Sequence, residues 1–272
     1  MSGAPAHAPG HRHPAHRGIR RGVSILPSLF TLANLFCGWA CVVYAMRGDV
    51  STAAPFIGVA IVLDMLDGRI ARMTGTTSDF GVQLDSLADL ISFGMAPAVL
   101  TFVWGLVPLG RLGWAAGFLY LTGAALRLAR FNIQAHVDKR YFAGLPSPAA
   151  AAIPAATVFY YPAGLQARPE AYLGLAVMLV PALLMVSTIR FRSFKTFDLR
   201  ARRRYQSLIG LAGLLALGVS YPQEVLLIMA YAYLASAFVG QAITRIRHRH
   251  DPAPVGAHGE SGRTAGDLHR DA

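Results

Sequence analysis

Long blocks of apolar residues dominate this chain and restrict what it can fold into. They cover residues 26–46, 52–63, 90–109, 112–126, 147–165, 171–189, 208–220 and 224–243, with few polar positions inside them. Charged residues make up only 14% of the chain, whereas soluble domains contain about 25%. A helix crosses a bilayer with about 20 apolar residues, or fewer where its polar end is buried in a bundle. The pattern therefore predicts an all-α polytopic membrane protein with about eight transmembrane helices.

The two ends of the chain are polar instead. Residues 1–24 combine histidines with Pro, Gly and Arg, and the last part of the chain is also polar and lacks a hydrophobic period. Segments of this composition do not bury enough apolar surface to fold by themselves. We expect a disordered cytoplasmic arm at 1–24, one transmembrane domain at 25–244 and a disordered cytoplasmic tail at 245–272.

The basic residues predict how the spans are oriented. If the N-terminus is cytoplasmic and there are eight spans, all of the 25 Lys and Arg residues except Arg47, Arg111 and Arg168 lie on the cytoplasmic side. This asymmetry obeys the positive-inside rule. It favours an integral protein of a bacterial inner (plasma) membrane with both termini in the cytoplasm. The net charge of +11 then reflects topology and contact with anionic lipid, not nucleic-acid binding.

One stretch between the second and third apolar blocks is strongly charged: LDMLDGRIARMTGTTSDFGVQLDSLADL, residues 63–90. Asp64 and Asp67 are three residues apart and share a helix face, whereas Asp85 and Asp89 are four apart and share a face of the next helix. A short polar turn joins the two helices, so we expect them to be antiparallel neighbours. Four carboxylates then converge from two sides.

Carboxylates gathered in this way repel one another unless a cation neutralises them. Oxygen ligands without nearby His or Cys favour Mg²⁺, Mn²⁺ or Ca²⁺ over zinc. Two such ions are suited to clamp a diphosphate during in-line displacement. Gly68 and Gly81 leave room for a substrate, and Arg72 is suited to hold a phosphate. In the turn, Ser78 or Asp79 suits the cap of the following helix, and we expect Asp79 to be structural.

A transporter is the alternative interpretation of the same stretch, because proton and cation pathways also use carboxylates within the membrane. A transporter predicts polar residues that recur through several spans and form a path to the outer side. The fifth and sixth apolar blocks, 147–165 and 171–189, contain few such residues. The carboxylate spacing thus favours metal-assisted phosphoryl chemistry but leaves transport open.

The charged stretch also follows a fixed pattern, D-x-x-D-G-x-x-A-R, then eight residues, then G-x-x-x-D-x-x-x-D. Its fixed positions are Asp64, Asp67, Gly68, Ala71, Arg72, Gly81, Asp85 and Asp89. This pattern resembles the signature of the CDP-alcohol phosphatidyltransferase family at every position. The resemblance implies a six-helix catalytic core with a di-metal site facing the cytoplasm, usually in a homodimer, to which two C-terminal helices are added here. It also implies transfer of a phosphatidyl-type group from a CDP-linked donor to an alcohol, with release of CMP.

Other segments narrow the resemblance to the phosphatidylserine synthases of the integral-membrane type. These segments are LPSLFTLANLFCG (26–38), DSLADLISFGMAPA (85–98), RLARFN (127–132), GLPSPAAA (144–151) and VSTIRFRSFK (186–195). The substrates implied are CDP-diacylglycerol and L-serine. A relative in the same family that uses glycerol-3-phosphate or inositol phosphate is the alternative.

The resemblance also implies roles for individual residues. Asp64, Asp67, Asp85 and Asp89 are expected to bind Mg²⁺ or Mn²⁺, two ions per site, and Asp89 is expected to act also as the general base. The expected donor-binding residues are Gly68, Arg72, Ser78, Thr31 and Asn34. The carboxylate of serine calls for a basic side chain, and the candidates are Arg127, Arg130, Arg190, Arg192 and Lys195. Anchoring at the membrane surface is the alternative role for each of these five.

Overall fold

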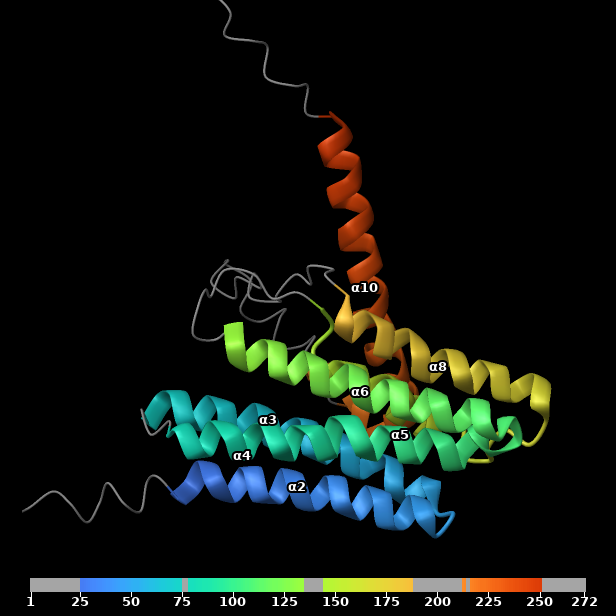
Figure 1. The fold of residues 1–272 in the computed structure, drawn as a ribbon, viewed down its shortest axis with the longest axis horizontal. Helices are drawn as coiled ribbons and strands as arrows, with labels where there is room; N and C mark the ends of the chain where they lie inside the picture. The colour runs from blue at the N-terminus through green and yellow to red at the C-terminus, as the bar shows by residue number, and fades with distance from the viewer. Residues whose placement is uncertain (1–24, 75–77, 135–143, 188–211, 214–215, 251–272) are drawn as a thin grey trace, which may run out of the picture.

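The computed structural model describes residues 25–74, 78–134, 144–187, 212–213 and 216–250, with side chains except at 25–27, 71–72, 74, 134 and 237–250. All regular elements in this part of the chain are helices, which confirms the all-α prediction (Figure 1).

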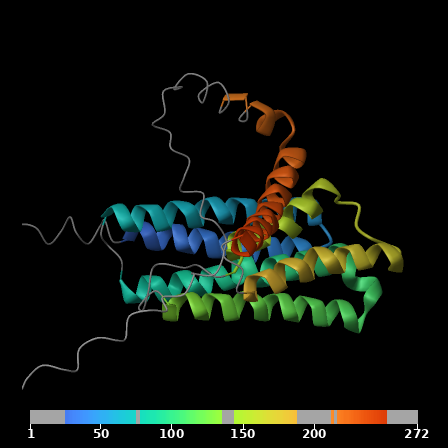
Figure 2. The ribbon, with the colours of Figure 1, turned by 90° about the horizontal axis from the view of Figure 1, so that it is seen from above.

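The chain forms a bundle of helices that alternate in direction (Figures 1 and 2). The bundle contains α2 (Ile25–Met46), α3 (Val50–Thr74), a composite third rod, α6 (Arg111–Gln134), α7 (Ser147–Tyr160) and α8 (Arg168–Val186). The third rod consists of α4 (Asp79–Asp89), η1 (Leu90–Met95), α5 (Ala96–Thr101), η2 (Phe102–Leu106) and η3 (Val107–Leu109). Because the direction alternates, the end of α3, the start of α4, the end of α6 and the start of α7 lie at the same end of the bundle.

Five of these rods are long and apolar enough to cross a membrane: Ser28–Met46, Val50–Ile70, Asp79–Leu109, Arg111–Ile133 and Arg168–Val186. They identify the chain as an integral membrane protein. The predicted number of eight spans is not confirmed. The expected fifth span is the helix α7, which has only 14 residues and is shorter than the roughly 20 residues that a full crossing needs. The expected seventh span, 208–220, is described only at 212–213 and 216–220.

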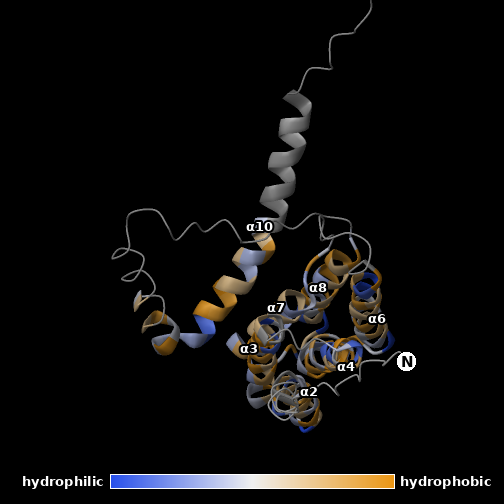
Figure 3. Cartoon of the chain, turned by 90° about the vertical axis from the view of Figure 1, so that its left-hand side faces the viewer, coloured by the Kyte–Doolittle hydropathy of each residue, from blue (hydrophilic) through white to orange (hydrophobic). Residues whose placement is uncertain are grey.

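The short helix α7 lies inside the bundle, between α3 and α8 in the end-on view of Figure 3. More than half of its residues are buried. The last helix, α10 (Pro222–His250), runs at a steep angle to the bundle and packs its first half against α7 (Figures 1 and 3). A hydrogen bond of 3.0 Å between the hydroxyls of Thr157 and Tyr231 ties the two helices together.

The start of α7 is fixed by a tight turn at Gly144. This residue has a φ of +94°, a conformation that side chains other than glycine's rarely adopt. A Cβ there would also lie 2.5 Å from the carbonyl oxygen of Met185, at the end of α8. The next residue, Leu145, donates its amide to the carbonyl of Leu184 at 3.0 Å. The turn therefore sets the first residues of α7 directly against the end of α8.

The third rod contains two π-helical segments, η1 and η2, within an otherwise α-helical course. Such segments are rare and are often found at functional sites, because the wider turn changes which side chains face a neighbour. The first of them begins immediately after Asp89 and presents Ser92, Phe93 and Gly94 to the interior. The irregularity thus lies next to the charged stretch.

Candidate functional site

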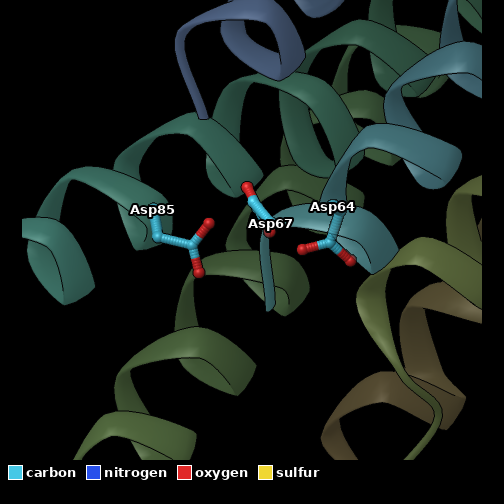
Figure 4. Close-up of side chains that lie close together, drawn as sticks. All are labelled: Asp64, Asp67 and Asp85. Atoms are coloured by element: carbon cyan, nitrogen blue, oxygen red, sulfur yellow. The ribbon is translucent and has the colours of Figure 1, made fainter. Parts of the chain in front are cut away.

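Three aspartates meet at one end of the bundle (Figure 4). Asp64 and Asp67 come from the last turns of α3, and Asp85 comes from α4. One carboxylate oxygen from each can be chosen so that all three atoms lie within 4.8 Å of one another. Asp67 is buried, whereas Asp64 and Asp85 are partly exposed. The convergence of carboxylates from two antiparallel helices is therefore as the spacing predicts.

The electrostatics of this cluster favour a bound cation. Two full charges 4.8 Å apart repel by about 3.5 kcal/mol at an effective dielectric constant of about 20. The Oδ1 atom of Asp85 is buried and makes no hydrogen bond within the described part of the chain. A divalent cation would remove the repulsion and give this oxygen a partner. The three carboxylates offer only oxygen, the ligand preferred by Mg²⁺, Mn²⁺ and Ca²⁺, so the residues present fit such an ion.

The fourth aspartate, Asp89, lies beside this cluster and differs from its members in having an amide side chain as a hydrogen-bond partner. It is the last residue of α4, and it interacts electrostatically with Asp64 and Asp85. Its Oδ1 accepts a hydrogen bond of 3.2 Å from Nδ2 of Asn34, on α2. The same face of α2 carries Thr31, whose hydroxyl donates to Oδ2 of Asp67 at 3.3 Å. Two of the residues expected to bind the donor thus have aspartates as partners.

Arg127, near the end of α6, brings a positive charge to the aspartates. Its guanidinium interacts electrostatically with Asp89 and Asp64 and with Tyr233 from α10. Its Nη1 donates to the hydroxyl of Ser147 at 2.7 Å, and Ser147 is fully buried at the start of α7. Nε of Arg127 is buried and has no hydrogen-bond partner among the described residues. The guanidinium is therefore held on one side and retains donors for a ligand.

The other acceptor candidates are placed differently. Arg130 is exposed on the last turns of α6. Arg190, Arg192 and Lys195 lie outside the described residues, so their roles stay predictions. Of the two candidates that the structure describes, Arg127 and Arg130, it brings Arg127 to the aspartates.

The donor candidates near the turn are placed as follows. A Cβ on Gly68 would meet nothing within 4 Å, so the surface beside it is open. Arg72 belongs to α3, but its side chain lies outside the described part. Ser78 is the N-cap of α4, since its hydroxyl accepts the amide of Gly81 at 3.0 Å. Asp79, expected to be structural, is exposed in the first turn, where a negative charge stabilises the helix dipole.

Three polar residues at this end had no assigned role in the sequence interpretation: Ser86, Ser92 and Ser147. Ser86 accepts a hydrogen bond of 2.9 Å from Nδ2 of Asn132, which links α4 to α6. Ser92 donates to the backbone carbonyl of Asn34 at 2.8 Å, which links η1 to α2. Serines at helix contacts in a membrane protein carry no sequence signal of their own, because they are equally common on packed faces without function.

Known proteins resemble this chain over the same region. Residues 24–190 match the model of the CDP-alcohol phosphatidyltransferase family. The CDP-diacylglycerol–serine O-phosphatidyltransferase of Helicobacter pylori is 38% identical over 177 residues, which cover 63% of this chain and 73% of the relative. The protein of the same name from Bacillus subtilis is 32% identical over 173 residues, covering 64% and 93%. The archaetidylserine synthase of Methanothermobacter thermautotrophicus is 33% identical over 168 residues, covering 61% and 69%. These matches confirm the resemblance indicated by the aspartate pattern.

Proposed function

Because the chain belongs to the CDP-alcohol phosphatidyltransferase family, we propose that it transfers the phosphatidyl group of CDP-diacylglycerol to the hydroxyl of L-serine and releases CMP. The choice of serine is supported by relatives named for that reaction. The observation that carries the proposal is the arrangement at one end of the bundle. Three aspartates are suited to hold cations, a fourth stands beside them, and the guanidinium of Arg127 faces the group.

Asp64, Asp67 and Asp85 would hold the metal, Mg²⁺ or Mn²⁺, with two ions in the site and with Asp89 as a further ligand. When bound, the ions neutralise charge on the diphosphate and stabilise the leaving phosphate of CMP. Without cations, the three carboxylates would repel the diphosphate, since both carry negative charge. The metal aspartates therefore determine whether the donor can bind at all.

Asp89 acts as the general base. A base must lie within hydrogen-bonding reach of the proton that it removes. Asn34 occupies one oxygen of Asp89, and the other oxygen takes the proton of the serine hydroxyl. The serine oxygen forms a bond to the phosphorus on the lipid side of the diphosphate, the bond between that phosphorus and the bridging oxygen breaks, and CMP leaves with the electron pair.

The donor lies along the end of α3 and the turn that follows. Gly68 leaves its side of the helix open, so that the diphosphate can approach the backbone, and Arg72 and Ser78 bind phosphate oxygens. Thr31 and Asn34 lie behind the aspartates rather than in this open area, and they act through the carboxylates to which they are hydrogen-bonded.

Arg127 binds the carboxylate of L-serine. An arginine is suited to this because its planar guanidinium matches a carboxylate with two parallel hydrogen bonds. Ser147 fixes Arg127 from the side of α7. When serine lies between Arg127 and Asp89, its carboxylate faces the guanidinium of Arg127 and its hydroxyl faces the general base Asp89. The acceptor site is thereby built from α6 and α7, whereas the metal site is built from α3 and α4.

This end of the bundle faces the cytoplasm of a bacterium, and the protein resides in the inner membrane as a homodimer. The cytoplasmic orientation is supported by the distribution of Lys and Arg along the chain. It also fits the chemistry, since CMP is a water-soluble nucleotide that must leave into the compartment that supplies serine.

A cation-coupled transporter predicts a continuous polar path across the bundle. Among the described residues, the buried Ser, Thr, Asn and Asp side chains are Thr31, Asn34, Asp67, Ser92, Thr101 and Ser147. Thr101 is the member farthest along the third rod from the aspartates, and its hydroxyl bonds to the carbonyl of Pro97 in its own helix. The described residues thus favour a site that is open at one end over a pathway.

The test is an assay of CMP release by purified protein supplied with CDP-diacylglycerol, Mn²⁺ or Mg²⁺, and one acceptor at a time. The acceptors are L-serine, glycerol-3-phosphate and inositol phosphate. We expect release with serine alone. Release with either phosphorylated alcohol but not with serine would contradict the choice of substrate. No release with any acceptor, from folded protein that binds metal, would favour transport.

A further inference from the structure

Helix α2 contributes a polar face to the site although it carries no charged residue there. Thr31, Asn34 and Gly38 are spaced by three and four residues, so they lie on one side of the helix. Thr31 is 6% exposed and Asn34 is fully buried. Each of their side chains bonds to an aspartate from a different element: Thr31 to Asp67 of α3 and Asn34 to Asp89 of α4.

The contact between α2 and the third rod is as close as two backbones permit. A Cβ on Gly38 would lie 2.5 Å from Oγ of Ser92 and 2.7 Å from its Cα, so only glycine fits at this position. The hydroxyl of Ser92 donates to the backbone carbonyl of Asn34 at 2.8 Å. Ser92 lies in η1, three residues after Asp89. The contact between Gly38 and Ser92 therefore fixes the position of Asn34 along the helix axis relative to Asp89.

We propose that this face of α2 positions two aspartates with different tasks: Asn34 holds the general base Asp89, and Thr31 holds the metal ligand Asp67. The inference rests on the proposed function, since it takes those tasks from it. A carboxylate on a short side chain can adopt several staggered rotamers. A hydrogen bond from a buried amide selects one of them, and a displacement of about 1 Å at a reacting group can reduce a rate roughly 100-fold.

The two positioning residues are expected to affect different quantities. Asn34→Ala frees Asp89 and should lower kcat by roughly 10- to 100-fold even at saturating metal, while the KM for CDP-diacylglycerol stays within about threefold of wild type. Its metal affinity should fall less than that of Thr31→Val, because Asp64, Asp67 and Asp85 keep their positions. Thr31→Val removes only the hydroxyl that orients Asp67. Loss of a partner that orients a metal ligand weakens metal binding by roughly 10- to 100-fold, and turnover should recover when metal is saturating.

Ser92→Ala provides a milder variant in case Asn34→Ala does not fold. It removes the bond to the carbonyl of Asn34 but leaves the amide of Asn34 in place. A neutral hydrogen bond contributes about 1 kcal/mol, so kcat should fall by roughly fivefold. Metal affinity should again fall less than in Thr31→Val.

The experiment measures two quantities on full-length protein in detergent. Metal affinity is read from the electron paramagnetic resonance signal of free Mn²⁺, which requires no turnover. CMP release is then measured as a function of Mn²⁺ and of donor, so that kcat and KM are separated. Thr101→Val is the matched control for Thr31→Val, since the hydroxyl of Thr101 is equally buried but bonds within its own helix. Tyr231→Phe is the control for lost stability, because it removes an interhelical bond in which no aspartate takes part.

The expected result is a kcat that stays low at saturating Mn²⁺ for Asn34→Ala, and a larger loss of Mn²⁺ affinity with a kcat that recovers at saturating Mn²⁺ for Thr31→Val. The positioning role is overturned if Asn34→Ala retains the wild-type kcat, or if both variants weaken Mn²⁺ binding equally. It is also overturned if the kcat of Asn34→Ala falls no further than that of Tyr231→Phe at the same loss of thermal stability.

Asp89→Asn separates this inference from the proposed function. If Asp89→Asn still turns over, the assignment of the base is wrong. If Asp89→Asn is inactive and Asn34→Ala behaves as wild type, only the positioning role is wrong.

Discussion

Replacement of Arg127 by lysine tests the acceptor site most sharply. Lysine keeps the positive charge but loses the planar fork that pairs with a carboxylate. The hydroxyl of Ser147, 2.7 Å from Nη1, orients the guanidinium and cannot orient a shorter ammonium in the same way. We therefore expect Arg127→Lys to weaken serine binding without affecting the donor.

The size of the effect follows from the bonds lost. A hydrogen bond to a charged group contributes about 1.5 to 3 kcal/mol, and each 1.4 kcal/mol corresponds to a factor of about 10. Loss of one of two parallel bonds should raise the KM for serine roughly 10- to 140-fold. Arg127→Met removes both bonds and leaves Asp64 and Asp89 without their facing cation, so it should have the larger effect.

The assay compares L-serine with serinamide, in which a neutral amide replaces the carboxylate. Wild-type protein should prefer serine, and this preference in kcat/KM should largely disappear in Arg127→Met. Arg111→Lys is the control, since Arg111 is exposed at the opposite end of the same helix. If Arg127→Met slowed both acceptors equally, or if the KM for CDP-diacylglycerol rose in parallel, Arg127 would not be the carboxylate-binding residue.

Three further changes have distinct expected outcomes. Asp85→Asn removes one of three clustered carboxylates and should weaken Mn²⁺ binding by at least roughly 100-fold. The effect is large because the change alters a metal ligand itself rather than a residue that orients one. Near-normal Mn²⁺ binding would show that Asp85 is not a metal ligand. Gly68→Ala should raise the KM for CDP-diacylglycerol without loss of thermal stability, since the added methyl meets no protein atom within 4 Å; an unchanged KM would show that the donor does not approach there. Gly38→Ala should lower the free energy of unfolding by about 1 to 3 kcal/mol, because the added methyl clashes with Ser92. Gly117→Ala is the control: a Cβ there would meet nothing within 4 Å, so the change should be neutral or slightly stabilising.

The aspartate end of the bundle was predictable from sequence because its information is local. Asp64 and Asp67 lie one turn apart, as do Asp85 and Asp89, and the short turn leaves few ways to arrange the two helices. The helical periods alone therefore bring these carboxylates together. The N-cap at Ser78 is local in the same sense, although the sequence did not distinguish it from Asp79.

Other features depend on packing between distant segments and were not predictable. The bond from Asn34 to Asp89 requires the register of α2 against the third rod, which the Gly38–Ser92 contact and the π-helical segment η1 determine. Five basic residues were equivalent acceptor candidates in the sequence. The meeting of α6 with α7 distinguishes Arg127 from Arg130, since it puts Ser147 beside the guanidinium of Arg127.

Hydropathy did not give the length of the helix in the fifth predicted span. The block 147–165 is continuous in sequence, but helix α7 ends at Tyr160 after 14 residues. The chain then turns at Gly164, which has a φ of +76°. A helix surrounded by other helices does not need to present a full apolar length to lipid, so the length of an apolar block does not fix the length of a buried helix.

The central claim is that this site joins serine to the phosphatidyl group with Asp89 as the base. It is tested most directly by protein reconstituted in vesicles that contain CDP-diacylglycerol, supplied with Mn²⁺ and isotope-labelled L-serine. Mass spectrometry of the extracted lipid and measurement of CMP give the stoichiometry. We expect one labelled phosphatidylserine for each CMP from wild-type protein, and neither product from Asp89→Asn. Release of CMP without labelled lipid, or labelled lipid formed by Asp89→Asn at the wild-type rate, would contradict the account.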